Sequence, residues 1–418
     1  MDYNRALSKL TEYGQEHLLH FYDKLSEEKQ KILLAQIERL DLEQIKSLYN
    51  LIKQPAKNEE AKVEPINYID KAKLSKEDIE KYEEIGNETL STGKIAAVTM
   101  AGGQGTRLGH KGPKGTFNLG LKNNKTLFEI ICDTFKKVQK ENGVTIPWYI
   151  MTSEENNAET MEFFEKNNYF EYPKDAITFF KQGQYPMIDT NGKVLLDENG
   201  LIKEAADGHG GVYMAMLKNG IMEDMKSKGI KWVEVCGVDN VLVNMFDPVF
   251  LGIFIEQGYP SASKSVVKDY PEEKVGVFCK KNGKPSIIEY TELSEEMAFD
   301  RDENGELKYG ESNIIVHIFE LETMEYISKN ILQYHPAFKK ANYMDENGNI
   351  VIGAEPNAYK FEAFIFDAFE QLENMSIVRV NRADEFAPIK NSDEKGVDCP
   401  KTARELYKKH FGIEEEEA

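Results

Sequence analysis

Hydrophobic residues in the first 53 positions recur at the three- and four-residue spacing of amphipathic helices. Leu7 and Leu10 begin the pattern, and three further groups continue it: Leu18, Phe21, Tyr22 and Leu25; Ile32, Leu33, Leu34 and Ile37; and Ile45, Leu48, Tyr49 and Ile52. The pattern predicts a helical appendage packed on a main domain, with a partner-binding helical face as the alternative. Residues 54–70 are polar and contain two prolines, which predicts a surface linker before a short helix over 75–85.

From residue 94 the pattern changes to short apolar runs that alternate with amphipathic stretches. The runs predict strands at 94–100, 146–152, 177–181, 231–236 and 263–268, and the stretches between them predict helices at 127–141, 156–167, 210–227 and 247–257. This alternation favours βα units and a parallel sheet. Beyond residue 275, Asn282-Gly283 predicts a hairpin turn, followed by a strand at 313–319, a helix at 359–372, a strand at 376–381 and a helix near 400–410.

Composition narrows the class of protein. The 418 residues predict two or three domains, or one large α/β domain with appendages, and 41% hydrophobic residues suffice for a substantial core. The net charge of −20 disfavours a nucleic-acid groove, although a small phosphorylated ligand needs only a few local cations. Four dispersed cysteines predict free thiols in a reducing compartment. With no apolar signal core and no run near the ~20 residues of a membrane span, we expect a cytoplasmic protein that binds no membrane.

The stretch from 97 to 117, AVTMAGGQGTRLGHKGPKGTF, follows a predicted strand and is rich in glycine. Glycines allow close backbone approach to a ligand, and successive N–H groups form concavities that suit phosphate oxygens. Arg107 and Lys114 add positive charge. A Walker loop is excluded because Gly115 follows Lys114, and a dinucleotide fingerprint, hence an NAD-dependent enzyme, is disfavoured because Leu108 replaces the third glycine. The remaining alternative is a turn without a ligand.

The motifs AGGQGTRLG, PKGTFNLGL and KTLFEI together resemble the UDP-sugar pyrophosphorylase family, the eukaryotic-type UTP:sugar-1-phosphate uridylyltransferases. The resemblance runs from about residue 94 to 393 and is closest to the members that act on N-acetylglucosamine. It implies an α/β fold with a Rossmann-like, GT-A-like nucleotidyltransferase core and a mixed, mostly parallel sheet. The expected domains are an N-terminal helical region with linker (1–90), the nucleotidyltransferase core (91–385) and a short C-terminal segment carrying Lys390 (386–418).

The resemblance also implies a set of site residues. The catalytic cations are Arg107, Lys114 and Lys390. The nucleotide contacts are Ala101, Gly102, Gly103, Gln182, Gly208, Asp239 and Lys360, and the sugar contacts are His209, Glu289 and Asn313. Asp239 ends a predicted strand, and an oxygen ligand at that place suits Mg²⁺, the expected cofactor. The substrates would be UTP and a sugar 1-phosphate, most simply N-acetylglucosamine 1-phosphate, giving the UDP-sugar and diphosphate.

Three departures from the family pattern leave alternatives open. His209 stands where the acetylated-sugar enzymes usually have asparagine, and Val316 stands where the family often has a second asparagine. A UDP-glucose, UDP-galactose or broad-specificity pyrophosphorylase is therefore an alternative. Only 28 residues follow Lys390, where eukaryotic members carry a longer domain, so we expect a monomer or weak homo-oligomer. An inactive UDP-sugar-binding regulator is the alternative of another class.

Overall fold

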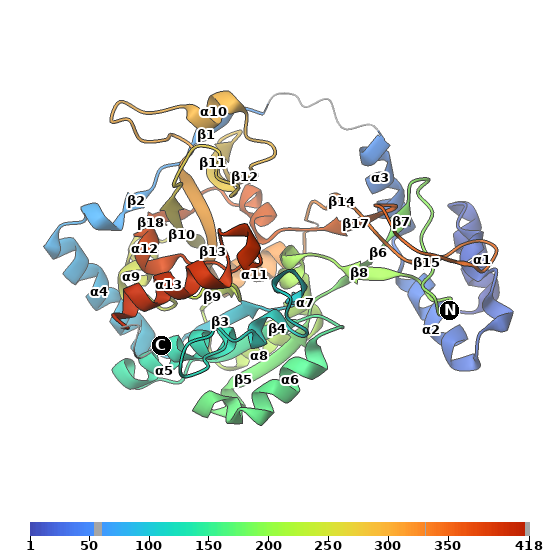
Figure 1. The fold of residues 1–418 in the computed structure, drawn as a ribbon, viewed down its shortest axis with the longest axis horizontal. Coiled ribbons are helices and arrows are strands. Elements are labelled where there is room, and N and C mark those ends of the chain that lie inside the picture. Colours follow the sequence, from blue (N-terminus) through green and yellow to red (C-terminus); the bar gives the residue numbers. More distant parts are fainter. Residues whose placement is uncertain (54–60, 331, 414–418) are drawn as a thin grey trace. The chain divides into compact units, whose positions relative to one another are not determined.

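The computed structural model describes residues 1–53, 61–330 and 332–413. It divides into two compact units, each assembled from separate stretches of the chain (Figure 1). The smaller unit contains 1–60, 183–211 and 332–365, and the larger unit contains 61–182, 212–331 and 366–418. The domain ranges 1–90, 91–385 and 386–418 stay a prediction. Residues 54–60 of the expected linker lie outside the described residues.

The larger unit is built on a mixed, mostly parallel sheet, as the sequence predicts. Its strands run in the order β2 (Ile69–Asp70), β18 (Ser376–Arg379), β10 (Ser261–Val267), β13 (Glu311–Glu320), β9 (Trp232–Gly237), β3 (Ile95–Met100), β4 (Trp148–Thr152) and β5 (Ile177–Lys181). Only β13 runs against the other seven strands of this path. The central strands β3 and β4 are buried at every position, as expected for parallel strands covered on both faces.

An antiparallel extension joins this sheet at β13. β11 (Val277–Lys281) and β12 (Lys284–Ile288) form the predicted hairpin, and both Asn282 and Gly283 have positive φ, as a tight hairpin turn requires. β1 (Val63–Pro65) pairs with β11 and β2 pairs with β18. The described part of the expected linker therefore contributes two short strands to the sheet.

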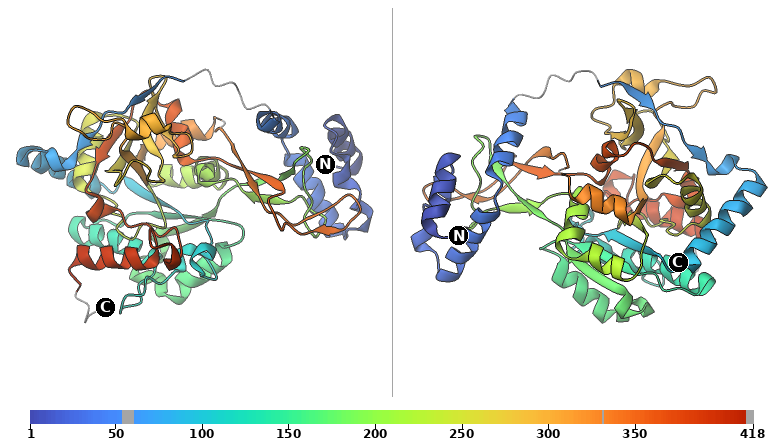
Figure 2. Two further views of the ribbon diagram at one scale, coloured as in Figure 1. Left: turned by 45° about the horizontal axis from the view of Figure 1, so that its top comes forward. Right: turned by 180° about the vertical axis from the view of Figure 1, so that it is seen from behind.

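Helices cover both faces of the larger sheet. α5 (Leu127–Asn142), α9 (Pro248–Gln257) and α13 (Pro400–Phe411) share one apolar core with β3 and β4. α7 (Val212–Lys218), α8 (Ile221–Ser227) and α11 (Leu321–Ser328) lie on the opposite face (Figure 2). The single helix expected over 210–227 is wrong, because Gly220 adopts a left-handed conformation that separates α7 from α8. The remaining helices are α4 (Lys76–Ser91), α6 (Asn157–Lys166), α10 (Glu295–Phe299) and α12 (Arg382–Glu385).

The smaller unit packs three helices against short strands. α1 (Tyr3–Glu12), α2 (Glu27–Arg39) and α3 (Leu42–Lys53) bury most of the predicted apolar stripes, but Ile32 is exposed, and the group around Phe21 lies in short 3₁₀ turns. The strands are β14 (His335–Lys339), β17 (Ala358–Glu362) and β7 (Ile188–Asp189) in one sheet, with the pairs β6 (Gln184–Pro186)–β8 (Glu204–Ala206) and β15 (Tyr343–Met344)–β16 (Ile350–Val351).

The helix predicted at 359–372 is also wrong. The structure has strand β17 and then a 3₁₀ stretch, Ile365–Gln371. Within β17 the two fully buried residues are Ala358 and Phe361, and Tyr and Phe favour strands, so pairing with β14 and β7 overrides a weak helical pattern.

The topology places several chain segments at one edge of the larger sheet. β3, β4, β5 and β9 are parallel, so their carboxyl ends share that edge. β3 lies between β9 and β4, which is where the strand order reverses, and ligands of open α/β sheets bind at such a switch point. All four cysteines are buried free thiols. Across the described residues, no helix combines the length and apolar character needed to span a bilayer.

Candidate active site

The glycine loop leaves the carboxyl end of β3 and folds back on itself. Gly105 N–H donates to the carbonyl of Gly112 (3.0 Å), and Lys114 N–H donates to the carbonyl of Gly103 (3.0 Å). Gly103 is exposed, and a side chain added there would meet nothing within 4 Å. The loop is therefore held by its own backbone bonds while the Gly103 turn stays open to a ligand.

A buried asparagine that the sequence analysis did not single out anchors this loop. Asn156 follows the neighbouring strand β4, is fully buried, and donates from Nδ2 to the carbonyls of Ala101 (3.0 Å) and Gly103 (3.3 Å). Its Oδ1 accepts from the N–H of Ser153 (2.8 Å). The signal in the sequence was a Ser-x-x-Asn pair directly after a predicted strand, at the same sheet edge as the glycine loop.

Gln182 lies against the glycine loop at the carboxyl end of β5. A Cβ built on Gly102 would be 2.5 Å from Oε1 of Gln182, so only glycine fits at this position without moving the amide. The backbone N–H of Gln182 donates to the carbonyl of Thr152 (2.8 Å) and continues the β4–β5 ladder. The structure thus brings together two of the predicted nucleotide contacts.

Asp239, Lys114 and Lys390 form a compact charged group. Asp239 follows β9, and its Oδ2 accepts a hydrogen bond from Nζ of Lys114 (3.2 Å). The carbonyl of Asp239 accepts a hydrogen bond from the N–H of Ile389 (2.9 Å), and Lys390 is the next residue in the chain after Ile389. Burial alone would raise the pKa of Asp239, but the positive charges of Lys114 and Lys390 outweigh burial and hold that pKa below its ordinary value. The carboxylate is therefore ionised at neutral pH.

Arg107 is not part of this charged group in the structure. It lies in the 3₁₀ turn Thr106–Leu108, its side chain is exposed, and it forms no hydrogen bond or ion pair with the described residues. The predicted contact of Arg107 with a phosphate therefore stays a prediction.

The two predicted sugar contacts of the larger unit meet at Gly276. Asn313 N–H donates to the carbonyl of Gly276 (2.9 Å), and a Cβ on Gly276 would be 3.0 Å from Oε1 of Glu289. Asn313 Oδ1 accepts from the N–H of Ile315 (2.9 Å). Ile315 has φ of +56°, which is rare for a β-branched residue. Such strain inside a strand is typical of functional sites.

A bulge in β13 accounts for this conformation. β10 residues Ser263 and Ser265 are opposite His317 and Asn313, so two extra β13 residues bulge out there. Bulges beside active sites re-aim side chains. Here the bulge brings Ile315 to the end of β9, because a Cβ built on Gly237 would lie 3.8 Å from Cγ2 of Ile315 and 3.2 Å from Oδ1 of Asp239.

Gly208, His209 and Lys360 belong to the smaller unit. Gly208 has φ of +85°, and a Cβ there would be 2.3 Å from the carbonyl of Ala363. His209 Nδ1 accepts from the N–H of Ile365 (3.1 Å), so a neutral His209 carries its proton on Nε2. Lys360 lies on strand β17 and not at a helix start, and its Nζ pairs with Glu362 (2.7 Å).

The donor set around Asp239 fits Mg²⁺ only together with a ligand. Among the described residues no group of three or more His, Cys, Asp or Glu side chains could hold a metal ion. Mg²⁺ commonly uses one or two carboxylates and completes its shell with water and substrate phosphates. A single ionised carboxylate beside a glycine loop meets that requirement.

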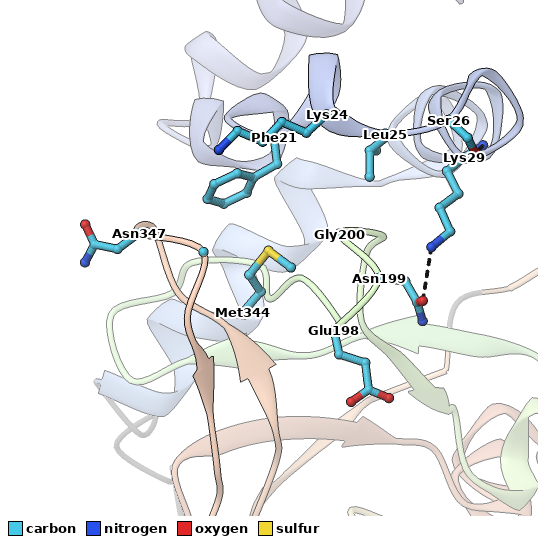
Figure 3. A pocket seen from close by; sticks show the side chains of 11 residues that line it. Phe21, Lys24, Leu25, Ser26, Lys29, Glu198, Asn199, Gly200, Met344 and Asn347 are labelled. Carbon is cyan, nitrogen blue, oxygen red and sulfur yellow. Dashed lines mark hydrogen bonds between the residues drawn. The ribbon is translucent and has the colours of Figure 1, made fainter.

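The smaller unit also contains a cavity of about 440 Å³, drawn in Figure 3. Its lining residues are Phe21, Lys24, Leu25, Ser26, Lys29, Glu198, Asn199, Gly200, Met344, Asn347 and Gly348. None of them is a predicted site residue, and Lys29 is already bonded to Asn199 (3.1 Å).

Known proteins with similar sequences identify the family to which this chain belongs. The model of the UTP–glucose-1-phosphate uridylyltransferase family matches residues 21–400. The human protein named UDP-N-acetylhexosamine pyrophosphorylase-like protein 1 is 36% identical over 97% of this chain and 84% of its own length. UDP-N-acetylglucosamine diphosphorylase 2 of Arabidopsis thaliana is 39% identical over 96% and 82%.

A solved structure agrees with these relatives. The crystal structure of the uridine diphosphate N-acetylglucosamine pyrophosphorylase from Trypanosoma brucei matches with a TM-score of 0.81 and 30% identity, over 96% of this chain and 84% of that one. The glycine loop, the paired Lys114 and Asp239, and the mixed sheet agree with this likeness. The chain belongs to the UTP–glucose-1-phosphate uridylyltransferase family.

Proposed function

We propose that this chain is a uridylyltransferase that converts UTP and N-acetylglucosamine 1-phosphate to UDP-N-acetylglucosamine and diphosphate. The observation that carries the proposal is the charged group of Lys114, Asp239 and Lys390 at the edge where the glycine loop leaves β3. A triphosphate needs such a concentration of backbone N–H groups and cations. Curated relatives at 36–39% identity support the choice of an acetylated amino sugar.

In the proposed reaction an oxygen of the sugar phosphate attacks the α-phosphorus of UTP in line. The bond between that phosphorus and the bridging oxygen of the β-phosphate breaks, and diphosphate leaves with the electron pair. The nucleophile is already an anion, so the step needs no general base. The difficulty is the repulsion between two anions, and catalysis consists of positioning and charge neutralisation.

Each residue of the larger unit has a defined part in this step. The N–H groups of the glycine loop and the ammonium of Lys114 bind phosphate oxygens of the leaving diphosphate, and Arg107 reaches the same group. Lys390 neutralises the phosphates that become joined. Mg²⁺, held by Asp239, would supply further positive charge to the phosphate oxygens.

The remaining contacts select the substrates. The amide of Gln182 both donates and accepts hydrogen bonds, as reading the uracil edge requires. The carboxylate of Glu289 accepts hydrogen bonds from sugar hydroxyls, and the amide of Asn313 donates to them. In the smaller unit, Gly208 and Lys360 are assigned to UTP, and His209 to the sugar.

The test is diphosphate release measured with UTP and Mg²⁺ across a panel of sugar 1-phosphates. We expect N-acetylglucosamine 1-phosphate to give the highest kcat/KM, and ATP, CTP and GTP to give little product. Preference for glucose 1-phosphate would replace the proposed sugar with the alternative that His209 leaves open. Tight UDP-sugar binding without diphosphate release with any sugar 1-phosphate would overturn the proposed enzyme activity and support a UDP-sugar-binding regulator.

Compartment and assembly complete the proposal. We infer a cytoplasmic protein that works as a monomer or weak homo-oligomer, since neither a nucleic acid nor a membrane is needed for the reaction. Sedimentation at micromolar concentration, with and without UTP, measures the assembly directly, and a tight oligomer would contradict this part.

A further inference from the structure

A fully buried lysine lies behind the proposed site. Lys264, on β10, has no exposed surface. Its Nζ donates to Oε2 of Glu385 (2.5 Å) and to the carbonyl of Asn244 (2.9 Å), and it pairs with Oδ2 of Asp247 (3.2 Å). Burying an ammonium is costly, and an apolar side chain of similar size is often as stabilising. Stability alone therefore does not account for a buried ion cluster at this place.

The lysine closes one end of a short pairing between two segments, residues 239–244 and 385–390. Asn240 connects them with its side chain, because Nδ2 donates to the carbonyl of Glu385 (2.7 Å) and Oδ1 accepts from the N–H of Ala387 (2.9 Å). The backbone contact of Asn240 with Pro388 is antiparallel. The two segments therefore run side by side in opposite directions, and Asn240 links them near the Asp239 end.

The other end of this pairing carries the reacting charges. Asp239 begins the first segment and Lys390 ends the second, and the hydrogen bond from Ile389 N–H to the carbonyl of Asp239 holds them side by side (2.9 Å). Lys264 binds the first segment at Asn244 and the second at Glu385. The buried ammonium thus joins both segments at the end remote from Asp239 and Lys390, beside a long direct bond from Nδ2 of Asn244 to Oε1 of Glu385 (3.4 Å).

The chain around Lys264 is also conformationally strained. Phe246, between Asn244 and Asp247, has φ of +60°, and its N–H donates to Oε2 of the buried Glu234 (2.9 Å). The first segment leads into this turn, and the carbonyl of Asn244 and the carboxylates of Glu385 and Asp247 converge beside it on the ammonium of Lys264.

We propose that Lys264 is a positioning residue for the uridylyltransferase reaction, and that its three bonds set the register in which Asp239 and Lys390 meet the phosphates. It touches no reacting atom and acts through Glu385 and Asn244. The inference rests on the proposed function. It assigns the buried ion cluster a role in turnover in addition to folding.

The test is a double-mutant cycle on turnover between Lys264→Met and Lys390→Met. Loss of register lowers kcat of Lys264→Met by at least ~10-fold, on the scale of a small misplacement of a reacting group. In the Lys390→Met background the same change lowers kcat much less, because the ammonium that Lys264 aligns is already absent. A merely structural role would lower both backgrounds by the same factor, and that result overturns the inference.

A second variant keeps the test valid if Lys264→Met does not fold. Lys264→Met with Glu385→Gln removes both buried charges, while Asp247 retains its bond to Lys71 (2.6 Å). The control is Lys9→Met in the smaller unit, whose ammonium also binds three acceptors, the carbonyls of Ile37, Glu38 and Leu40. This control loses stability but shows no coupling to Lys390→Met.

The cycle separates the inference from the function. An active wild-type enzyme with unchanged kcat in the folded double variant overturns the role of Lys264 and leaves the proposed function standing. A wild-type chain that releases no diphosphate from UTP with any sugar 1-phosphate overturns both.

Discussion

Replacing Lys114 with methionine tests the charge-neutralisation mechanism at its best-defined cation. The substitution keeps an apolar stem of similar length and removes the ammonium that lies 3.2 Å from Asp239 Oδ2. Lys114 is 18% exposed at its side chain, so its charge acts in a largely water-excluded place.

The expected magnitude follows from the loss of one preorganised cation. Such a loss costs ~3–4 kcal/mol of transition-state stabilisation, which corresponds to a fall in kcat of ~100- to 1000-fold. The folding cost is smaller, because one charge-assisted hydrogen bond contributes about 1.5–3 kcal/mol. The variant is therefore expected to fold and to lose turnover.

The assay is diphosphate release at saturating UTP and sugar 1-phosphate, with the melting temperature measured on the same preparation. Lys111→Met is the matched control, because Lys111 is an exposed lysine of the same loop. Full turnover in Lys114→Met, or an equal loss in Lys111→Met, would refute the assigned role.

Three further changes probe the loop and the core. Gly102→Ala places a methyl group 2.5 Å from Gln182 Oε1; we expect KM for UTP to rise ~10-fold or more with little change in melting temperature, and an unchanged KM would contradict the uracil contact. Asn156→Ala removes two bonds to loop carbonyls and should cost about 1–3 kcal/mol of stability and weaken UTP binding by calorimetry; a loss of stability with unaltered UTP affinity would limit Asn156 to folding. Burial raises the pKa of Glu234 to about 8. The protonated carboxyl therefore stabilises the folded state fully below the unfolded pKa near 4.5, and this contribution, on the order of a few kcal/mol, is lost as pH rises towards 8. Denaturant unfolding from pH 5 to 9 should show that Glu234→Gln removes this fall of the unfolding free energy with pH, and a fall equal to that of the wild type would count against the assignment.

Most strands of the main sheet and several helices of the larger unit could be predicted, because periodicity and burial agree there. The predicted strand at 177–181 coincides with β5, and the predicted helix at 127–141 differs from α5 by one residue. Asn282-Gly283 forms the expected hairpin because its turn conformation is a local property. The family resemblance is confirmed, since the family model spans residues 21–400.

The structural features that could not be predicted from the sequence depend on pairing between segments that are distant in the chain. Lys360 was expected at a helix start, but β14 and β7 supply strand partners from 335–339 and 188–189. The apolar stripes of 1–53 gave no information about their partners, which include Ile188 and Phe361. The Ser-x-x-Asn pair marks Asn156 locally, but its bonds to the carbonyls of residues 101 and 103, like the bonds of Lys264 to Asn244 and Glu385, join groups that are distant in the chain.

The most direct measurement is a crystal structure of the chain with UTP. We expect phosphate oxygens against the N–H groups of residues 102–104, within hydrogen-bond distance of the ammonium groups of Lys114 and Lys390, and the uracil at Gln182. A triphosphate bound elsewhere, with Lys114 still paired only to Asp239 and the glycine loop empty, would contradict the account.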